Sequence, residues 1–179
     1  MPTIFTHAFV GAAGGKLLTP SRWSIMGLSA ICAAIPDVDV VSFRFDVAYG
    51  SEFSHRGISH SILFAAFVGL LAGWLVWRFL ANREYTWGRW SLYFFLITLT
   101  HPILDAFTDG GLGVALFAPF DQTRYFFPFR PLKVAPIALS RFFSPRGLQV
   151  ILSGLAWVWM PIVLLVMIGG KFLTRSENE

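Results

Sequence analysis

Apolar residues fill two long stretches of the chain. Ile58–Leu80 has His60 near its start and Arg78 near its end, and Leu148–Gly170 has no charged residue. A helix rises about 1.5 Å per residue, so each stretch reaches about 34 Å, which exceeds the hydrocarbon core of about 30 Å. Both are therefore predicted to cross a lipid bilayer as helices, and Pro161 is expected to kink the second one.

A third apolar stretch, Ser91–Thr108, has a different composition. It is largely apolar as far as Leu99 and then carries His101, Pro102 and Asp105. Ionisable side chains at membrane depth cost free energy and mark functional positions in membrane proteins. This stretch is predicted to be a third span and to contribute to a site.

The N-terminal part of the chain contains two shorter apolar segments, Ile4–Leu18 and Trp23–Ile35, which Pro20 separates. Both segments are rich in small residues, which allow helix backbones to approach each other closely in membranes. They are predicted to form a short helical hairpin.

Two longer and more polar connections join these segments. Residues 36–57 contain PDVD and end in SHRG, and residues 109–147 hold five of the ten prolines, which argues against a long helix. The stretch FAPFDQTRYFFPFRPLK mixes aromatic residues with Arg and Pro, as segments at headgroup depth do. If successive helices alternate in direction, both connections and all four histidines lie at one end, here called side B, and the opposite end is side A.

These patterns predict an all-α fold, a multi-pass transmembrane helical bundle with three full spans and a short N-terminal helical hairpin. Residues 1–170 are expected to form a single membrane-embedded domain, and residues 171–179 a polar tail. The composition agrees, because 55% of the residues are hydrophobic and 13% are charged, whereas soluble domains carry roughly 25% charged residues. A soluble enzyme and a disordered chain are thereby excluded.

The charge and the cysteine content narrow the possible partners and covalent links. The net charge is +4, but no basic run of the kind that binds nucleic acid is present, so no nucleic-acid partner is expected. Cys32 is the single cysteine, so no intrachain disulfide can form, and it is expected to be inert packing. The N-terminus lacks the features of a cleaved signal peptide.

The third span offers the first candidate metal ligands. His101 and Asp105 are four residues apart, so on a helix they lie on one face, one turn apart. Asp109 would extend this stripe if the helix continued. Imidazole nitrogen and carboxylate oxygen both suit zinc, and they also suit manganese or iron.

The polar connection between residues 36 and 57 adds further candidates. Asp37 and Asp39 are two residues apart, and in an extended segment this spacing turns both carboxylates the same way. His55 and His60 are five apart, with Gly57 between them, so His55 is expected in the loop and His60 in the first helical turn, both facing one cavity.

A divalent metal held by such residues lowers the pKa of a bound water and polarises a scissile bond. A spare carboxylate, assigned here to Asp39, takes the proton. Arg56 is expected to grip a phosphate oxygen through two parallel hydrogen bonds, or alternatively to contact a lipid headgroup. The predicted catalytic residues are therefore Asp39 and Arg56, and the predicted metal ligands are His7, Asp37, His55, His60, His101 and Asp105.

Four ordered motifs, THAFVG, IPDVD, HRGISHS and HPILDAFTDGG, are followed by the aromatic segment PF…RYFFPFRP. With them the chain resembles the YdjM-like family of LexA-regulated, inner-membrane, metal-dependent hydrolases, over residues 6 to about 131. The resemblance implies a small multi-pass protein of the bacterial inner membrane, and its motif positions are the eight residues named above. The pattern is also loosely similar to zinc-dependent phospholipase C sites.

Other functions remain open at this point. A single histidine at a helix end is usually an interfacial residue, and it is the coincidence of four that favours a shared site. A transporter that uses His and Asp as a proton or metal relay needs polar residues across the whole bilayer, and the last span has none that ionises. A haem protein with paired axial histidines needs an apolar pocket, whereas acids flank these histidines.

The favoured hypothesis is a membrane-embedded, metal-dependent hydrolase, with zinc or alternatively manganese, that acts on a lipid or lipid-like phosphoester. Side A is predicted to face the cytoplasm, because the short loop Ala81–Trp90 holds its Arg residues beside the spans, where the positive-inside rule has most weight. The site would then lie at the periplasmic face.

Overall fold

The computed structural model describes residues 2–19, 21–80, 85–136 and 142–176, and within these ranges it is helical with no strand. Pro20, part of the loop after Leu80, part of the second long connection and the end of the polar tail lie outside the described residues. The elements, in chain order, are α1 (Ile4–Leu18), α2 (Trp23–Ala34), the 3-10 helices η1 (Ile35–Phe45) and η2 (Ile58–His60), α3 (Ile62–Leu75), the π-helical turn η3 (Val76–Leu80), α4 (Trp87–Ala106), α6 (Pro145–Gly154), the π-helical turn η4 (Leu155–Trp159) and α7 (Met160–Ser176).

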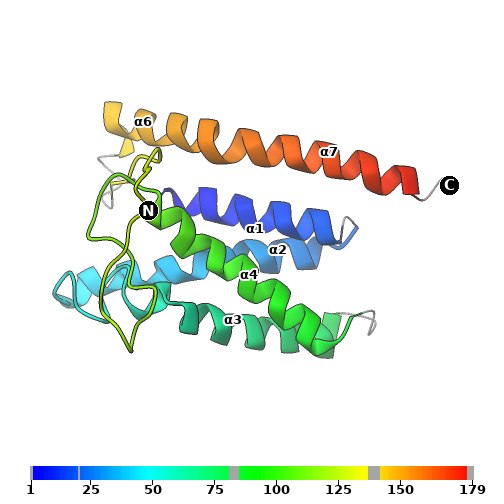
Figure 1. Ribbon diagram of the computed structural model, residues 1–179, viewed down its shortest axis with the longest axis horizontal. Coiled ribbons are helices and arrows are strands. Elements are labelled where there is room, and N and C mark those ends of the chain that lie inside the picture. The colour runs from blue at the N-terminus through cyan, green and yellow to red at the C-terminus, as the bar shows by residue number, and fades with distance from the viewer. Residues whose placement is uncertain (1, 20, 81–84, 137–141, 177–179) are drawn as a thin grey trace.

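The helices run alternately in opposite directions, as Figure 1 shows. Both long connections lie together at one end of the bundle, beside the start of α1, the end of α4 and the start of α6. This arrangement agrees with the predicted threading and brings the polar motifs to side B.

Three helical stretches are long and apolar enough to cross a membrane, and a shorter apolar helix, α1, precedes them. The three are Trp23–Phe45, Ile62–Leu80 and Pro145–Ile168. The first was predicted as part of the short hairpin, but α2 continues without a break into η1 and so becomes long enough to span. The predicted third span forms α4, whose polar residues at both ends make it less apolar than these three.

The interior of the bundle is an apolar core between α2, α3 and α4. Trp90 and Phe94 of α4 are its largest members, and Cys32 is buried among them, which agrees with a packing role. The last helix, Pro145–Ser176, is continuous through α6, η4 and α7. The widened turn η4 ends at Trp159, two residues before Pro161, and such a turn accommodates a residue that cannot donate a helical hydrogen bond.

Small residues bring α1 and α2 into close contact, as predicted. A Cβ atom added to Gly15 would lie 2.6 Å from the Met26 Cα, so the two backbones pack directly on each other there. We expect Gly15→Val to force the hairpin apart and to destabilise the protein by roughly 1–3 kcal/mol. Thermal unfolding in detergent measures this. Gly27→Val on the same hairpin is the matched control, because a Cβ at Gly27 meets no atom within 4 Å; equal losses in both variants would contradict the packing explanation.

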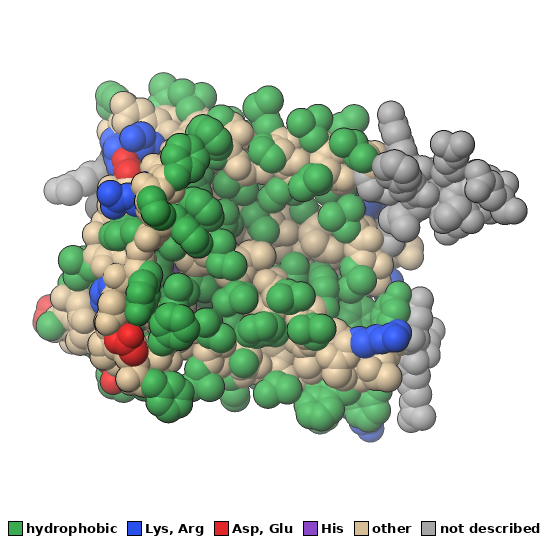
Figure 2. All heavy atoms as spheres, in the orientation of Figure 1, with side chains coloured by type: hydrophobic (Ala, Val, Ile, Leu, Met, Phe, Trp, Pro, Cys, Tyr) green, Lys and Arg blue, Asp and Glu red, His purple; other side chains and the backbone are tan. Residues whose placement is uncertain are grey.

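The surface agrees with a membrane location. Figure 2 shows charged side chains gathered at the two ends of the molecule, whereas apolar side chains cover most of the flank between them. Many large apolar residues are exposed on these flanks, among them Phe67 at 62% and Leu165 at 61%. In water such a surface would aggregate, but in lipid it matches its surroundings.

Candidate metal centre

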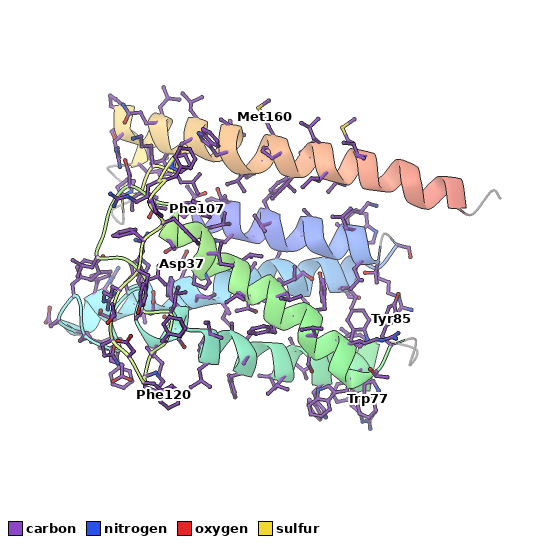
Figure 3. The ribbon with its side chains drawn as sticks, in the orientation of Figure 1. Asp37, Trp77, Tyr85, Phe107, Phe120 and Met160 are labelled. Atoms are coloured by element: carbon purple, nitrogen blue, oxygen red, sulfur yellow. The ribbon has the colours of Figure 1, made fainter. Side chains whose placement is uncertain are left out.

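All eight predicted site residues converge at side B. They come from five separate segments: His7 from α1, Asp37 and Asp39 from η1, His55 and Arg56 from the loop before η2, His60 from η2, and His101 and Asp105 from α4. Figure 3 shows Asp37 at this end of the bundle, whereas Trp77 and Tyr85 lie at the opposite end. The convergence was predicted from the threading, and the structure now gives the contacts within it.

Four of these residues face one point. One ligand atom from each of Asp37, His60, His101 and Asp105 lies within 4.8 Å of the others, and all four side chains are buried. The Nε2 atoms of His60 and His101 are 3.1 Å apart. The Asp37 Oδ1 lies 3.3 Å from the His101 Nε2, and the Asp105 Oδ2 lies 3.6 Å from the His60 Nε2. We call these four residues the inner set.

In His60 and His101, the hydrogen-bond partner of Nδ1 determines which ring nitrogen carries the proton. The Nδ1 of His101 is 2.7 Å from the Ala33 carbonyl oxygen, which can only accept, so this nitrogen carries the proton. The Nδ1 of His60 is 3.0 Å from the Asp39 Oδ2, which assigns its proton in the same way. When both rings are neutral, their Nε2 atoms point lone pairs at each other, and these repel unless a metal ion or an added proton lies between them.

The carboxylate of Asp37 favours a metal ion. Both of its oxygens are buried and accept no hydrogen bond from any described residue. A buried carboxylate without partners is costly, because its charge has lost its hydration. A divalent cation would satisfy these oxygens and the two Nε2 atoms together, and two imidazoles with two carboxylates are a donor set that suits zinc or manganese.

Asp39 has a different environment from Asp37. The segment that carries both is a 3-10 helix and is not extended, so the two side chains leave the backbone in different directions, although one oxygen of each lies within 4.8 Å of the other. Asp39 Oδ1 lies 2.7 Å from the His55 Nδ1, and its Oδ2 accepts hydrogen bonds from the Arg56 backbone N–H and the Ser59 hydroxyl, besides the contact with His60. The catalytic role of Asp39 stays a prediction, and these contacts favour an orienting role.

These contacts also distinguish between two possible metal-binding groups. Asp37, Asp39, His55 and His60 form a second cluster with ligand atoms within 4.8 Å. Protein donors already occupy both oxygens of Asp39 in that cluster, and the Nδ1 of His55 is one of these donors. The inner set is therefore the better metal site, and the assignment of His55 as a ligand stays a prediction.

Arg56 is buried and holds Asp105. Its Nε lies 2.9 Å from the Asp105 Oδ2, its Nη2 donates to the Thr108 hydroxyl at 2.9 Å, and its Nη1 donates to the Gly110 carbonyl at 2.9 Å. Its backbone is left-handed, at φ 66°, which costs about 1–3 kcal/mol for a residue other than glycine. Since three guanidinium donors bind protein acceptors, the geometry favours support of Asp105 over the predicted grip on phosphate.

His7 completes the cluster from α1. Its ring stacks on that of His101, with centroids 3.6 Å apart and an interplanar angle of 17°. Its Nε2 is 3.3 Å from the Asp105 Oδ1, and neither ring nitrogen makes a hydrogen bond with a described residue. His7 lies outside the two four-residue groups above, so its role as a ligand stays a prediction.

The helical stripe on α4 ends earlier than the sequence suggested. His101 and Asp105 do share a buried face, but α4 ends at Ala106 and Asp109 turns away to Lys133 and Arg146, each 3.0 Å from it. Partial burial works to raise the pKa of the Asp109 carboxyl, but the Val134 amide and these two cations hold the pKa below its usual value.

Sequence reasoning missed the residue that holds the loop around the site. Arg124 was assigned to a segment at headgroup depth, but its guanidinium donates to the carbonyl oxygens of Ser51, His55 and Arg56 and to the Ser54 hydroxyl. A cation bound to four neutral acceptors fixes the backbone that presents His55 and Arg56. The sequence signal was an Arg at the start of an aromatic run that also contains Arg130, which does not identify its acceptors.

A cavity of about 210 Å³ lies next to the cluster. His55 and Arg56 form part of its wall, together with Phe43, Tyr49 and Gly111. A Cβ on Gly111, at φ +90°, would come within 2.9 Å of the Arg56 guanidinium, so glycine is needed there for Arg56 to reach its place.

Comparisons with known proteins agree with this picture. The YdjM inner membrane protein family matches residues 1–176. The inner membrane protein YbcI of Escherichia coli (strain K12) is 44% identical over 172 residues, which cover 93% of this chain and 95% of that protein. No solved structure matches. A family match over nearly the whole chain and a relative of this similarity lead to one conclusion: the chain belongs to the YdjM family of inner membrane proteins.

Proposed function

We propose that this protein is a membrane-embedded, metal-dependent hydrolase that acts on a lipid-like phosphoester. The observation that carries the proposal is the pair of Nε2 atoms of His60 and His101, 3.1 Å apart, beside two buried Asp37 oxygens that no described residue satisfies. Asp37, His60, His101 and Asp105 would hold the metal. When bound, a divalent metal lowers the pKa of a water ligand towards about 7 and polarises the bond to be cleaved.

The surrounding residues keep the inner set in position. Asp39 orients His60, the Ala33 carbonyl orients His101, and Arg56 neutralises and orients Asp105. Such outer contacts fix the tautomer of each histidine and reduce the freedom of each ligand before metal binds. Burial of the whole set excludes bulk water, so charges act there more strongly than in solution.

The cavity of about 210 Å³ supports a substrate position beside His55 and Arg56, the latter of which holds Asp105 of the inner set. His55 lines this cavity, and Asp39 holds its Nδ1. A carboxylate that fixes one imidazole nitrogen leaves the other available for proton transfer. We therefore assign proton transfer to the Asp39–His55 pair, with Asp39 acting through His55.

We expect His55→Gln to retain the metal and to lose phosphoester hydrolysis by roughly 10²–10⁴-fold, because the variant keeps a polar side chain but cannot carry a proton. Metal analysis and hydrolysis measured on the same preparation test this. Loss of metal together with activity would instead make His55 a ligand, as the sequence first suggested.

The location of the cluster supports a hydrolase over a relay through the membrane. The Asp, His and Arg side chains of the cluster lie at side B, whereas the core between α2, α3 and α4 holds hydroxyl groups such as those of Ser29 and Tyr93 but, outside the cluster, no described Asp, Glu, His, Lys or Arg. A relay needs a chain of polar groups across the bilayer.

We place side B at the periplasmic face, on the positive-inside argument from the side-A loop. A reporter that fluoresces only in the cytoplasm, fused after Glu179, should then be bright. A dark fusion with good expression would move the site to the cytoplasmic face.

Metal analysis of the detergent-purified protein tests the proposed function most directly. We expect near-stoichiometric zinc or manganese, together with hydrolysis of a phospholipid phosphoester that a chelator abolishes and metal restores. Stoichiometric metal without hydrolysis of any phosphoester would reduce the proposal to metal binding. Absence of metal after growth in medium supplemented with zinc and manganese would contradict it.

A further inference from the structure

The last helix is attached to the bundle mainly through α1. Figure 1 shows it running alongside α1, on the outside of the bundle and away from α3. The contact is concentrated near its middle, where Trp159 stacks on Phe9 with centroids 4.2 Å apart and donates a hydrogen bond to the Thr6 hydroxyl at 3.3 Å. Gly154 also approaches Thr6, where an added Cβ would lie 3.4 Å from its hydroxyl.

Between this contact and side A, α1 and α7 leave a cavity of about 260 Å³. Ala12 and Ala13 of α1 form one wall, and Val163, Val166 and Met167 of α7 form the other. The hollow exists because the two alanines are too short to fill the space opposite α7. Met26 of α2 and Phe9 line the rest of it, and Lys16 stands at its end, in the last turn of α1.

The chemistry of this cavity excludes most occupants. Water needs two to four polar partners, and among the described side chains that line the cavity only that of Lys16 is polar. An empty space would deprive its lining of dispersion contacts. The wall from α7 is open to the surroundings, since Val163 is 44% exposed and Met167 is 59% exposed. In a membrane-spanning helix these surroundings are hydrocarbon, and Pro145–Ile168 is such a helix.

We propose that this cavity binds an acyl chain of an anionic phospholipid from the side-A leaflet, with the lipid phosphate at Lys16. A flexible chain is thin enough to enter between α1 and α7, whereas a helix of a second copy, about 10 Å wide, is not. The ammonium of Lys16 lies where a helix that ends at side A meets the headgroups, and it favours an anionic lipid. The bound chain fills the space between the last helix and α1, so the lipid stabilises the packing of that helix against the bundle. This inference does not depend on the proposed hydrolysis.

The test uses the full-length protein in detergent and phosphatidylglycerol with a photoreactive diazirine in one acyl chain. We expect crosslinks to map to the α1 segment that contains Ala12 and Ala13 and to the α7 segment near Met167. Added phosphatidylglycerol should also raise the thermal midpoint of delipidated protein. Crosslinks scattered over α3 and α4 to the same extent would overturn the proposal.

Filling the cavity gives the second part of the test. Ala13→Phe should lower the crosslinking yield roughly tenfold, because its ring occupies the space of the chain, and should abolish the lipid-dependent rise in midpoint. Ala12→Phe repeats the test if Ala13→Phe does not fold. Gly27→Phe, on α2 where an added side chain meets open space, is the matched control and should behave as wild type. A yield unchanged in both filled variants would overturn the proposal.

Further variants test which part of the protein binds the crosslinked lipid and whether a second chain covers the cavity. Lys16→Gln should reduce the preference for phosphatidylglycerol over phosphatidylcholine roughly fivefold and leave the chain site intact. Asp37→Asn should leave crosslinking unchanged, which separates this site from the candidate metal centre. Efficient disulfide pairing between two copies of Met167→Cys would show that a second chain covers the cavity, and would contradict a lipid occupant.

Discussion

Asp37→Asn is expected to abolish metal binding while leaving the fold intact. The substitution keeps the size of the side chain but removes the charge of Asp37, whose oxygens accept no hydrogen bond from a described residue and which, unlike Asp105 beside Arg56, has no described Arg or Lys paired with it. Changes to residues that merely support a metal ligand reduce affinity by about 10–100-fold, so loss of a ligand itself should exceed roughly 100-fold. Metal content and phosphoester hydrolysis should therefore both fall to background.

The metal-free protein adds a second, opposite expectation for the same variant. Because the buried Asp37 oxygens accept no hydrogen bond from a described residue and only histidines lie near them, replacing Asp37 by Asn removes a poorly compensated charge and should raise, or leave unchanged, the thermal midpoint measured in the presence of chelator. A structural role for Asp37 would instead lower that midpoint. Asp121→Asn is the control, since Asp121 is an exposed acid that contacts Thr123 and Tyr125 and should change neither metal content nor stability.

Arg56→Met should be the most destabilising single change in the site. It removes the guanidinium that neutralises Asp105, and breaking a buried ion pair from one side costs about 3–5 kcal/mol. Metal content should fall with stability, because Asp105 is a member of the inner set. Arg130→Met is the control, as Arg130 is exposed over the Phe126 ring, 4.9 Å from its centroid.

Arg56→Lys distinguishes charge from shape at the same position. A lysine keeps the charge beside Asp105 but cannot also reach Thr108 and the Gly110 carbonyl, so part of the stability and the metal should still be lost. Retention of full metal content with loss of turnover alone would restore the phosphate grip that the sequence suggested. Full activity with full metal content would show that neither the support of Asp105 nor the binding of phosphate requires the planar guanidinium group.

The convergence of the site was predictable because it depends on properties that are local in sequence. Each motif lies at the end of an apolar segment, and alternation of helix direction brings those ends together whatever the details of packing. The pairing of His101 with Asp105 on one face follows from helical periodicity alone, and the structure retains it. Close packing at Gly15 likewise follows from small residues in two apolar segments.

Predictions failed where a single local conformation determined the outcome. The extended segment expected for Asp37 and Asp39 is a 3-10 helix that continues α2, and this difference lengthens the first span. The sequence left open whether the helix would continue to Asp109; α4 ends at Ala106, and Asp109 lies beyond the stripe and pairs with Lys133 and Arg146.

Sequence by itself determined that this chain is a helical membrane protein with its histidines and most of its acids at one end, since low charge content and long apolar stretches leave no other way to satisfy the backbone in lipid. Only the tertiary structure decided the division of roles among those residues. Asp37 and Asp39 are chemically identical, and what distinguishes them is which donors from the other segments reach them: His55, Ser59 and the Arg56 amide reach Asp39, and none of the described donors hydrogen-bonds to Asp37. Those donors come from a different part of the chain, so the distinction follows from packing across segments and not from any pattern within one of them.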